Sequence, residues 1–483
     1  MRKRTEIICR LVLCAILLRV AFMAPDARAQ AAQSELPDAP AAQLMAAAIP
    51  PGSQHPQPPA GNTQAGAADQ TANKQTEPSL TVGQAEQMAI ANNPNVSVGR
   101  LLALAQAQVT REVRSIEMPQ ATTNLTAVDS HKGSRITGAG TINSPLILDK
   151  AAAGLTVSQL ITDFGRTHNL VKSAQSNARA QLEFERATEL DITLAVDQAF
   201  YQALMTQTVL KVAQDTVNQR QATNDQVSAL TKAKIRSDLD LSFAGVQLSQ
   251  AKLLLLDAQN NEESAMAVLN DVLGSDQDTR YRLVDETGGN LPPAPGNADA
   301  LIQTAFRQRP DLASLNDRYL AANQYSVAER DLWMPTVSAL LAAGGTPVRD
   351  DLVQSSWYLG AGANINIPVF NGFLYSADAR EAKYRAQAAR ENARSLRDNI
   401  ARDVRTAVLN AQTAYQRIAV TQDLLNQANF AMDLASARYK IGLSSIVELT
   451  QAQLAQTEAE IDYTNARFAY QTTLSVVRYQ TGQ

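Results

Sequence analysis

The feature that most constrains this chain is a long segment, 373–441, that contains neither Pro nor Gly. Apolar residues recur in it at every seventh position, and a sustained period of about 3.5 residues is typical of supercoiled helices. This seam contains Val404, Ala411, Ile418, Leu425, Met432 and Tyr439. A second seam is mostly Ala, which lets neighbouring helices approach closely. A helix over 375–440 would be roughly 100 Å long at about 1.5 Å per residue, longer than the helices of globular domains.

A β-strand is predicted over 357–367, directly before this helix. One set of alternate residues is apolar: Trp357, Leu359, Ala361, Ala363, Ile365 and Ile367. The residues between them are mostly Gly and Asn. Such alternation places the two sets on opposite faces of a strand. Pro368 and Gly372 then end the strand, so an amphipathic strand leads directly into a rod-like helix.

The chain also contains an internal duplication, which appears as pairs of similar motifs at a regular spacing. Two pairs share one spacing: Asn93-Pro94 with Arg309-Pro310, and Met118-Pro119 with Met334-Pro335. Three further pairs share a slightly shorter spacing: 163–165 with 371–373, 237–241 with 445–449, and 273–274 with 481–482. Because the spacing changes once, between Pro119 and Asp163, the first half has the longer loop.

Each half is predicted to be the same helix-helix-strand-strand-helix-helix unit. The first half has helices over 81–92 and 94–117, strands over 121–127 and 155–158, and helices over 166–233 and 238–273. The second half has helices over 298–307 and 310–333, strands over 336–343 and 357–367, and helices over 375–440 and 446–480. Polar residues 129–150 form the loop between the first two strands. The predicted fold class is therefore mainly α, with a smaller β part.

Four amphipathic strands cannot form a stable sheet of their own, because two edges and one apolar face stay uncovered. Inside a membrane every backbone polar group must be paired within the protein, so only helices and closed barrels can cross it. Four strands are too few to close a barrel. If these are membrane strands, several chains must share one barrel.

The N-terminus predicts secretion, with basic residues at Arg2, Lys3 and Arg4, an apolar stretch over 11–23 and a small-x-small site at 27–29. A membrane anchor is the alternative, but the apolar stretch is short for one. The predicted divisions are a signal peptide (1–29), a disordered Ala/Pro/Gln-rich arm (30–78), a first repeat (79–275), a linker (276–296) and a second repeat (297–483). Both cysteines lie in the signal peptide, so the mature chain would have no disulfide. The formal net charge is −4 and argues against a nucleic-acid partner.

The strand-to-helix junction 159–166, its degraded copy 368–372 and the turn 439–448 resemble the outer-membrane efflux protein (TolC-like) family. The resemblance covers roughly 79–482. It implies a homotrimer, with a β-barrel shared in outer-membrane lipid and a long α-helical coiled-coil barrel that extends into the periplasm. The function that it implies is the passive exit duct of a tripartite efflux pump or a type I secretion system. The implied partners are a periplasmic adaptor and an inner-membrane transporter, which would choose the cargo.

The resemblance also implies a periplasmic gate where the long helices turn. In the family, acidic residues on the last helix surround the closed end of the pore, and Glu448 matches the first of them. Gln451 stands where the second acid is expected, and Ser444 stands where the family has an arginine. Tyr439 matches the tyrosine of the family, and Gly442 belongs to the inter-helix turn.

The first half carries its own version of these gate residues. Arg236 stands at the copy of the missing arginine and Asp240 at the copy of Glu448, so we expect Arg236 to pair with Glu448 or Asp240. A simpler alternative is helix capping: Ser445, in the inter-helix turn, precedes Glu448 by the spacing of a capping box, and Ser237 precedes Asp240 in the same way.

The sequence shows no catalytic constellation. The three histidines, His55, His131 and His168, have no partner at metal-ligand spacing, so we expect no enzyme activity, metal or cofactor. The alternative to an export duct is a secreted periplasmic coiled-coil scaffold or adaptor without membrane strands. The apolar face of 357–367 argues against that alternative, because a soluble scaffold has no use for it.

Overall fold

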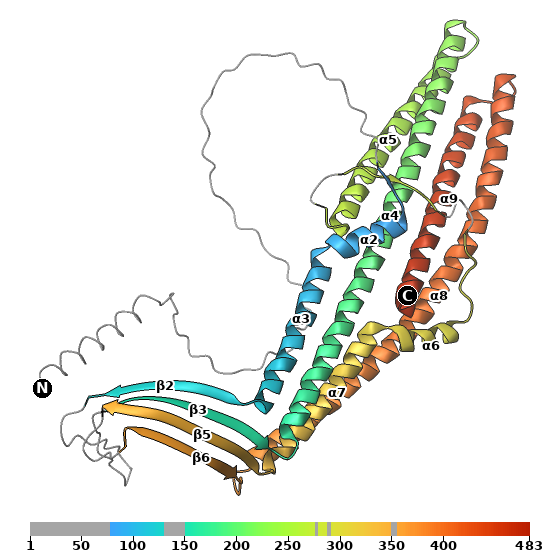
Figure 1. Ribbon diagram of the computed structural model, residues 1–483. Coiled ribbons are helices and arrows are strands. Elements are labelled where there is room, and N and C mark those ends of the chain that lie inside the picture. The colour runs from blue at the N-terminus through green and yellow to red at the C-terminus, as the bar shows by residue number, and fades with distance from the viewer. Residues whose placement is uncertain (1–77, 130–149, 276–278, 287–290, 349–354) are drawn as a thin grey trace, which may run out of the picture. The chain divides into compact units, whose positions relative to one another are not determined.

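The computed structural model describes residues 78–129, 150–275, 279–286, 291–348 and 355–483. Almost all of the predicted signal peptide and arm, and the loop over 130–149, lie outside these residues. The described part is a four-stranded antiparallel sheet and a set of helices that extends from it (Figure 1).

Both halves have the predicted order of elements. The first half comprises α2 (Val82–Asn92), α3 (Pro94–Arg114), β2 (Gln120–Val128), β3 (Lys150–Thr162), α4 (Arg166–Lys232) and α5 (Asp238–Val272). The second half comprises α6 (Ala298–Gln308), α7 (Pro310–Arg330), β5 (Thr336–Val348), β6 (Trp357–Asn366), α8 (Leu374–Lys440) and α9 (Ile446–Thr481). The predicted fold class is thus confirmed, and α4 and α8 are each 67 residues long.

The ends of two helices differ from the sequence prediction, and one short ladder was not predicted. The helices predicted to reach 117 and 333 end earlier, and their last turns are the 3₁₀ segments Ser115–Glu117 and Asp331–Trp333. A Pro follows each segment and cannot continue a helix, so the chain tightens before it. A short parallel ladder also joins β1 (Ser79–Leu80) to β4 (Arg282–Leu283), in the segment that connects the halves.

The strands β3 and β5 are longer than predicted, because glycines that resemble turn signals are paired across the sheet. Gly344 pairs with Gly154 between β5 and β3. The phenol of Tyr358 on β6 lies where a Cβ on Gly154 or Gly344 would be. Only glycine leaves room for this ring, so Gly154 and Gly344 allow an aromatic side chain to lie across two strands.

Strands and long helices follow one lateral order. The sheet order is β2-β3-β5-β6, with every neighbouring pair antiparallel. The helices α3, α4, α7 and α8 lie side by side in the corresponding order, since α3 packs on α4, α4 on α7 and α7 on α8 (Figure 1). The helices α5 and α9 pack as hairpins on α4 and α8, and α9 also contacts α4. The two halves therefore meet mainly at β3–β5, α4–α7 and α4–α9, with a smaller contact between α5 and α9.

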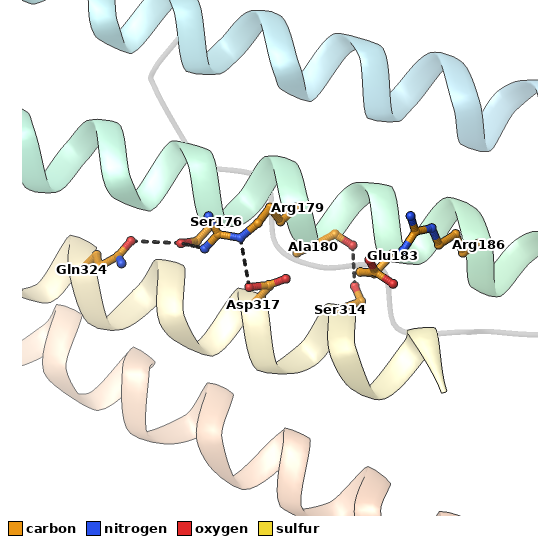
Figure 2. A network of polar contacts seen from close by, with 8 residues as sticks. All are labelled: Ser176, Arg179, Ala180, Glu183, Arg186, Ser314, Asp317 and Gln324. Carbon is orange, nitrogen blue, oxygen red and sulfur yellow. Dashed lines mark hydrogen bonds and ion pairs between the residues drawn. The ribbon is translucent and has the colours of Figure 1, made fainter. Parts of the chain in front are cut away.

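The α4–α7 contact is made by polar side chains (Figure 2). Ser176 Oγ donates to Gln324 Oε1 at 3.0 Å, and Arg179 Nε lies 3.4 Å from Asp317 Oδ1. Ser314 Oγ donates to the main-chain oxygen of Ala180 at 2.7 Å. Because these bonds connect residues on facing helices, they set the alignment of the two halves.

The repeat motifs found in the sequence meet in space. Gly274, after the last helix of the first half, touches the turn between α2 and α3, and Gly482 touches the turn between α6 and α7. Both glycines have positive φ, +71° and +79°. A Cβ on Gly482 would be 2.9 Å from the backbone nitrogen of Arg309. Each half thus fixes the end of its last helix against its own Pro-containing turn.

We expect Gly482→Ala to lower the free energy of unfolding by about 1–3 kcal/mol, because a side chain there is strained and meets backbone. Gly245→Ala is the matched control: Gly245 lies inside α5 with open space around it, so alanine should stabilise by about 0.5–1 kcal/mol. Thermal unfolding of the detergent-solubilised protein measures both. Equal melting temperatures for the two variants would contradict the packing described here.

Candidate functional site

The candidate site lies where α4 turns into α5 and α8 turns into α9. The two turns are built alike. Ser237 Oγ accepts from the Asp240 amide at 3.2 Å, and Ser445 Oγ accepts from the Glu448 amide at 3.3 Å. Gly442 has a φ of +80°, the left-handed conformation that glycine adopts most easily.

Lys234 takes the position of Gly442 in the first turn. It also has a positive φ, +59°. A left-handed lysine costs on the order of 1 kcal/mol, so the rest of the hairpin must stabilise this backbone. Both tips therefore share one turn shape, even though only one of them has the residue that favours it.

Arg236 connects the first hairpin to the second. Its Nη2 donates to the main-chain oxygen of Tyr439 at 3.1 Å, and its guanidinium carbon lies 4.5 Å from the centre of the Tyr439 ring. A cation over an aromatic face is attracted by the ring quadrupole. Within the described ranges Arg236 forms no ion pair with Glu448 or Asp240. The structure therefore corrects the expected pairing: Arg236 and Tyr439 come together, but through a ring and a carbonyl.

The two carboxylates have other partners. Asp240 accepts from the Ser237 amide at 3.4 Å, which completes a capping box at the start of α5. Glu448 pairs with Arg438 at 3.5 Å, and both side chains are nearly half exposed. Exposed pairs of this kind contribute little to stability. The capping alternative thus describes Asp240 in this chain, while Glu448 remains accessible for a second role.

Tyr439 is the centre of the tip. Only 3% of its surface is exposed, and its hydroxyl is buried without a hydrogen-bond partner among the described atoms. Burial raises the pKa of the Tyr439 phenol, the Arg236 guanidinium opposes the rise, and the Asp240 carboxylate adds to it. The charges of Arg236 and Asp240, both in the α4–α5 hairpin, therefore act on the Tyr439 ring of the α8–α9 hairpin.

An apolar cluster holds the two hairpins together around this ring. It combines Met432, Tyr439, Ile446 and Leu449 of the second hairpin with Val227 and Ala244 of the first. One turn further on, Gln453 Nε2 donates to Thr223 Oγ1 at 3.2 Å between α9 and α4. The heptad seam in the sequence includes Met432 and Tyr439 of this cluster, but the sequence offered no signal for the cross-hairpin bond of Gln453.

A second candidate surface appears when the two halves are compared. Positions at equivalent places, at the spacing that relates Ser237 to Ser445, are called counterparts here. Val212 on α4, a helix that packs against α9, is 6% exposed, whereas its counterpart Val420 on α8 is 68% exposed. Thr464 on α9 is 6% exposed, whereas its counterpart Leu256 on α5 is 63% exposed. The contact that α4 makes with α9 thus has apolar counterpart faces on α8 and α5 that none of the described residues covers.

Two further observations limit what the described part of the chain can do. It contains no group of three or more His, Cys, Asp or Glu side chains placed to hold a metal ion. Among its helices, none combines the length and the apolar character that crossing a membrane requires.

Comparison with known proteins identifies the family of this chain. The family Outer membrane efflux protein matches residues 86–275 and 301–483. The chain is 23% identical to the probable outer membrane lipoprotein SilC of Salmonella typhimurium over 368 residues, 73% of this chain and 78% of that protein. It is 24% identical to the outer membrane efflux protein BepC of Brucella suis, over 65% of this chain and 70% of that protein.

Solved structures show the same fold. A crystal structure of CusC superposes with a TM-score of 0.72 at 20% identity. The match covers 83% of this chain and 92% of that one. The CmeC outer membrane channel of Campylobacter jejuni superposes with a TM-score of 0.70 at 16% identity, over 88% and 94%. The match to the family extends over both halves. This chain belongs to the outer membrane efflux protein family, and it is a passive conduit of the outer membrane that extends into the periplasm, not an enzyme.

Proposed function

We propose that three copies of this chain form the outer-membrane exit duct of a tripartite efflux pump or a type I secretion system. A periplasmic adaptor and an inner-membrane transporter deliver the cargo. The observation that carries the proposal is the duplication: the contacts β3–β5, α4–α7 and α4–α9, which join the two halves, each have a counterpart surface left open at the edges of the described chain. In this proposal 1–29 is a signal peptide, 30–78 is an arm, and 79–275 and 297–483 are the repeats, joined by 276–296.

The sheet supplies the first open surface. The halves pair through β3 and β5, and the counterparts of these strands are β6 and β2, the two edges of the sheet. Pairing β6 of one copy with β2 of the next would repeat the β3–β5 contact and remove both edges. Three copies would give about twelve strands, enough to close a barrel around a lumen in outer-membrane lipid.

The helices supply matching surfaces. Val420 and Leu424 on α8 and Leu253 and Leu256 on α5 are exposed at helical spacing. Placing α5 of one copy against α8 of the next would repeat the α4–α9 contact. Large apolar patches that stay exposed in one chain commonly mark contacts with another chain.

The seam between copies differs in chemistry from the seam within a chain. Within the chain, α4 and α7 meet through the polar bonds of Figure 2. At the spacing that relates Asn93 to Arg309, the counterparts of Ser314 and Asp317 are Val98 and Leu101 on α3. At the spacing that relates Ser237 to Ser445, the counterpart of Ser176 is Tyr384 on α8. All three counterparts are exposed. We propose that this difference directs α3 to the α8 of a neighbouring copy, because a polar ladder cannot pair with an apolar stripe.

The helical tips would form the periplasmic gate. Arg236 fastens the first hairpin to Tyr439 of the second, and the turn of Gly442 and Ser445 positions Glu448. In this proposal Glu448 and Asp240 surround the narrow end of the duct. Relatives are named for cation efflux, antibiotic efflux and toluene efflux, so we propose that the transporter selects the cargo.

We expect Val420→Glu to dissociate the trimer, because it would bury a charge in the α8–α5 seam without a partner. Val420→Leu is the matched control and should leave three chains together. The mass of the detergent-solubilised protein, measured by light scattering, distinguishes the two. A parent protein that is monomeric in mild detergent, or a Val420→Glu trimer as stable as the parent, would refute the proposed assembly.

We expect Arg236→Ser to raise the open probability of single channels in planar bilayers by about tenfold. The substitution removes a hydrogen bond and a cation–π contact, together on the order of 1–2 kcal/mol. Arg438→Ser is the control, because its half-exposed pair with Glu448 contributes little. Equal effects of the two substitutions would show that Arg236 does not fasten the gate.

We expect Glu448→Gln to lower the cation selectivity of the open channel severalfold, because a ring of carboxylates in a narrow pore favours cations. The measurement is the reversal potential in a salt gradient. Asp240→Asn is the comparison, since the capping role of Asp240 should make its loss affect thermal stability more than selectivity. Unchanged selectivity of Glu448→Gln would place the narrow point elsewhere.

A further inference from the structure

A buried carboxylate lies far from the tips, where three helices meet. Asp197 on α4 is 3% exposed. Its Oδ2 accepts from Arg478 Nη2 of α9 at 2.9 Å, so it connects the first half to the second. Its Oδ1 is also buried, and no donor group of the described residues bonds to it. A buried carboxylate with one satisfied oxygen is incomplete, because an unpaired buried acceptor is costly.

Glu86 on α2 provides the missing donor. Ala85 and Ala89, on either side of Glu86, pack with Val196 and Phe200 of α4 in one buried cluster, and this packing brings the Glu86 side chain to Asp197, with which it interacts. Two carboxyl groups can bond to each other only when one of them carries a proton, because ionised carboxylates only accept. Burial, the bond to Asp197 and the charge of Asp197 raise the pKa of Glu86 to about 7, and Arg478 opposes the rise. A protonated Glu86 can donate to Asp197, and with a pKa of about 7 it loses this proton as the pH rises through neutrality.

The other charged groups around the pair do not neutralise it. Glu286, after β4, adds a further negative charge near Glu86 and raises its pKa. The neighbouring Asp285 pairs with Arg467 of α9 at 2.9 Å. Tyr201, one turn after Asp197 on α4, is buried and its pKa is raised to about 12, so it remains a neutral phenol. Arg478 is thus the one cation that acts directly on the two carboxyl groups within the described residues.

The second half shows that the fold does not require this pair. At the spacing that relates Asn93 to Arg309, the counterpart of Glu86 is Ile302 on α6. Ile302 is 4% exposed and packs against Ile400 and Val404 of α8. An apolar contact is therefore sufficient to attach a short helix at this place. The ion pair of α6 with α8, Asp299 with Arg405 at 3.6 Å, is exposed, so a buried carboxyl pair gives the attachment of α2 a dependence on pH near neutrality that the attachment of α6 lacks.

We propose that Glu86 and Asp197 share one proton that clamps α2 onto the α4–α9 contact, and that the clamp releases as the pH rises through neutrality. Loss of the proton leaves two adjacent carboxylates with one arginine, and like charges at this distance repel. The short helix α2 follows β1, which pairs with β4 in the segment between the halves. Release of α2 would loosen the β1–β4 ladder and, with it, the segment that joins the two repeats.

The direction of the pH effect on the attachment of α2 follows from the raised pKa of Glu86. The folded-state pKa of Glu86 lies above the ordinary value of 4.5. The proton therefore stabilises the attached state fully below about pH 4.5, and this stabilisation is lost as the pH rises to about 7. Between about pH 5.5 and pH 8 the equilibrium for detaching α2 should increase by on the order of tenfold or more.

The test is hydrogen–deuterium exchange of the full-length protein in detergent at about pH 5.5 and pH 8, corrected for intrinsic exchange rates. We expect protection of α2 to fall about tenfold or more at the higher pH. The control is within the same molecule: α6, with Ile302 in place of the carboxyl, should show no such change. Equal pH dependence of α2 and α6 in the parent protein would overturn the proposal without any variant.

Two substitutions separate the shared proton from general packing. Glu86→Gln keeps a hydrogen-bond donor toward Asp197 but cannot ionise, so α2 should remain protected at both pH values. Glu381→Gln removes an exposed carboxylate that pairs with Arg385 on α8, and should leave the pH dependence of α2 as in the parent. A pH dependence that persists in Glu86→Gln would assign the effect to another group.

Discussion

Unpaired backbone groups at the two sheet edges are the constraint on which the rest of this structure depends. The chain pairs β3 with β5 but leaves one side of β2 and one side of β6 without a partner within the described residues. In lipid each unpaired N–H or C=O costs several kcal/mol, so an open four-stranded sheet cannot remain there. A second pairing of the β3–β5 type removes this cost, and the duplication supplies the surfaces for it.

The long helices follow from the same arrangement. Because each strand pair leads directly into α4 or α8, closing the sheet also brings the helices of neighbouring copies together. The exposed apolar residues then have a physical role: Val420 and Leu256 are unfavourable in an isolated chain and favourable in a closed ring. The polar bonds around Ser176 and Ser314 keep the contact inside the chain distinct from the contact between chains.

The two halves differ in the polar residues through which they interact with each other. At the tips, Arg236 faces a carbonyl and a ring, while its counterpart Ser444 is a buried residue of the other turn. At the base, Asp197 and Arg478 connect α4 to α9, while their counterparts are Arg405 and Asn270. The two halves thus keep the same backbone arrangement, while the polar side chains that distinguish them lie at the two ends of the α4–α9 contact.

The sequence by itself determined the order of elements, the duplication and most helix boundaries, because these depend on local signals: Pro, Gly and the seven-residue period that includes Val404. Tertiary structure alone decided the ends of β3 and β5, since Gly154 and Gly344 are needed only once Tyr358 lies over them. It also decided the partner of Arg236, because a main-chain carbonyl leaves no trace in a residue pattern. Long-range contacts of this kind depend on which faces two distant helices present to each other, and local periodicity does not encode that choice.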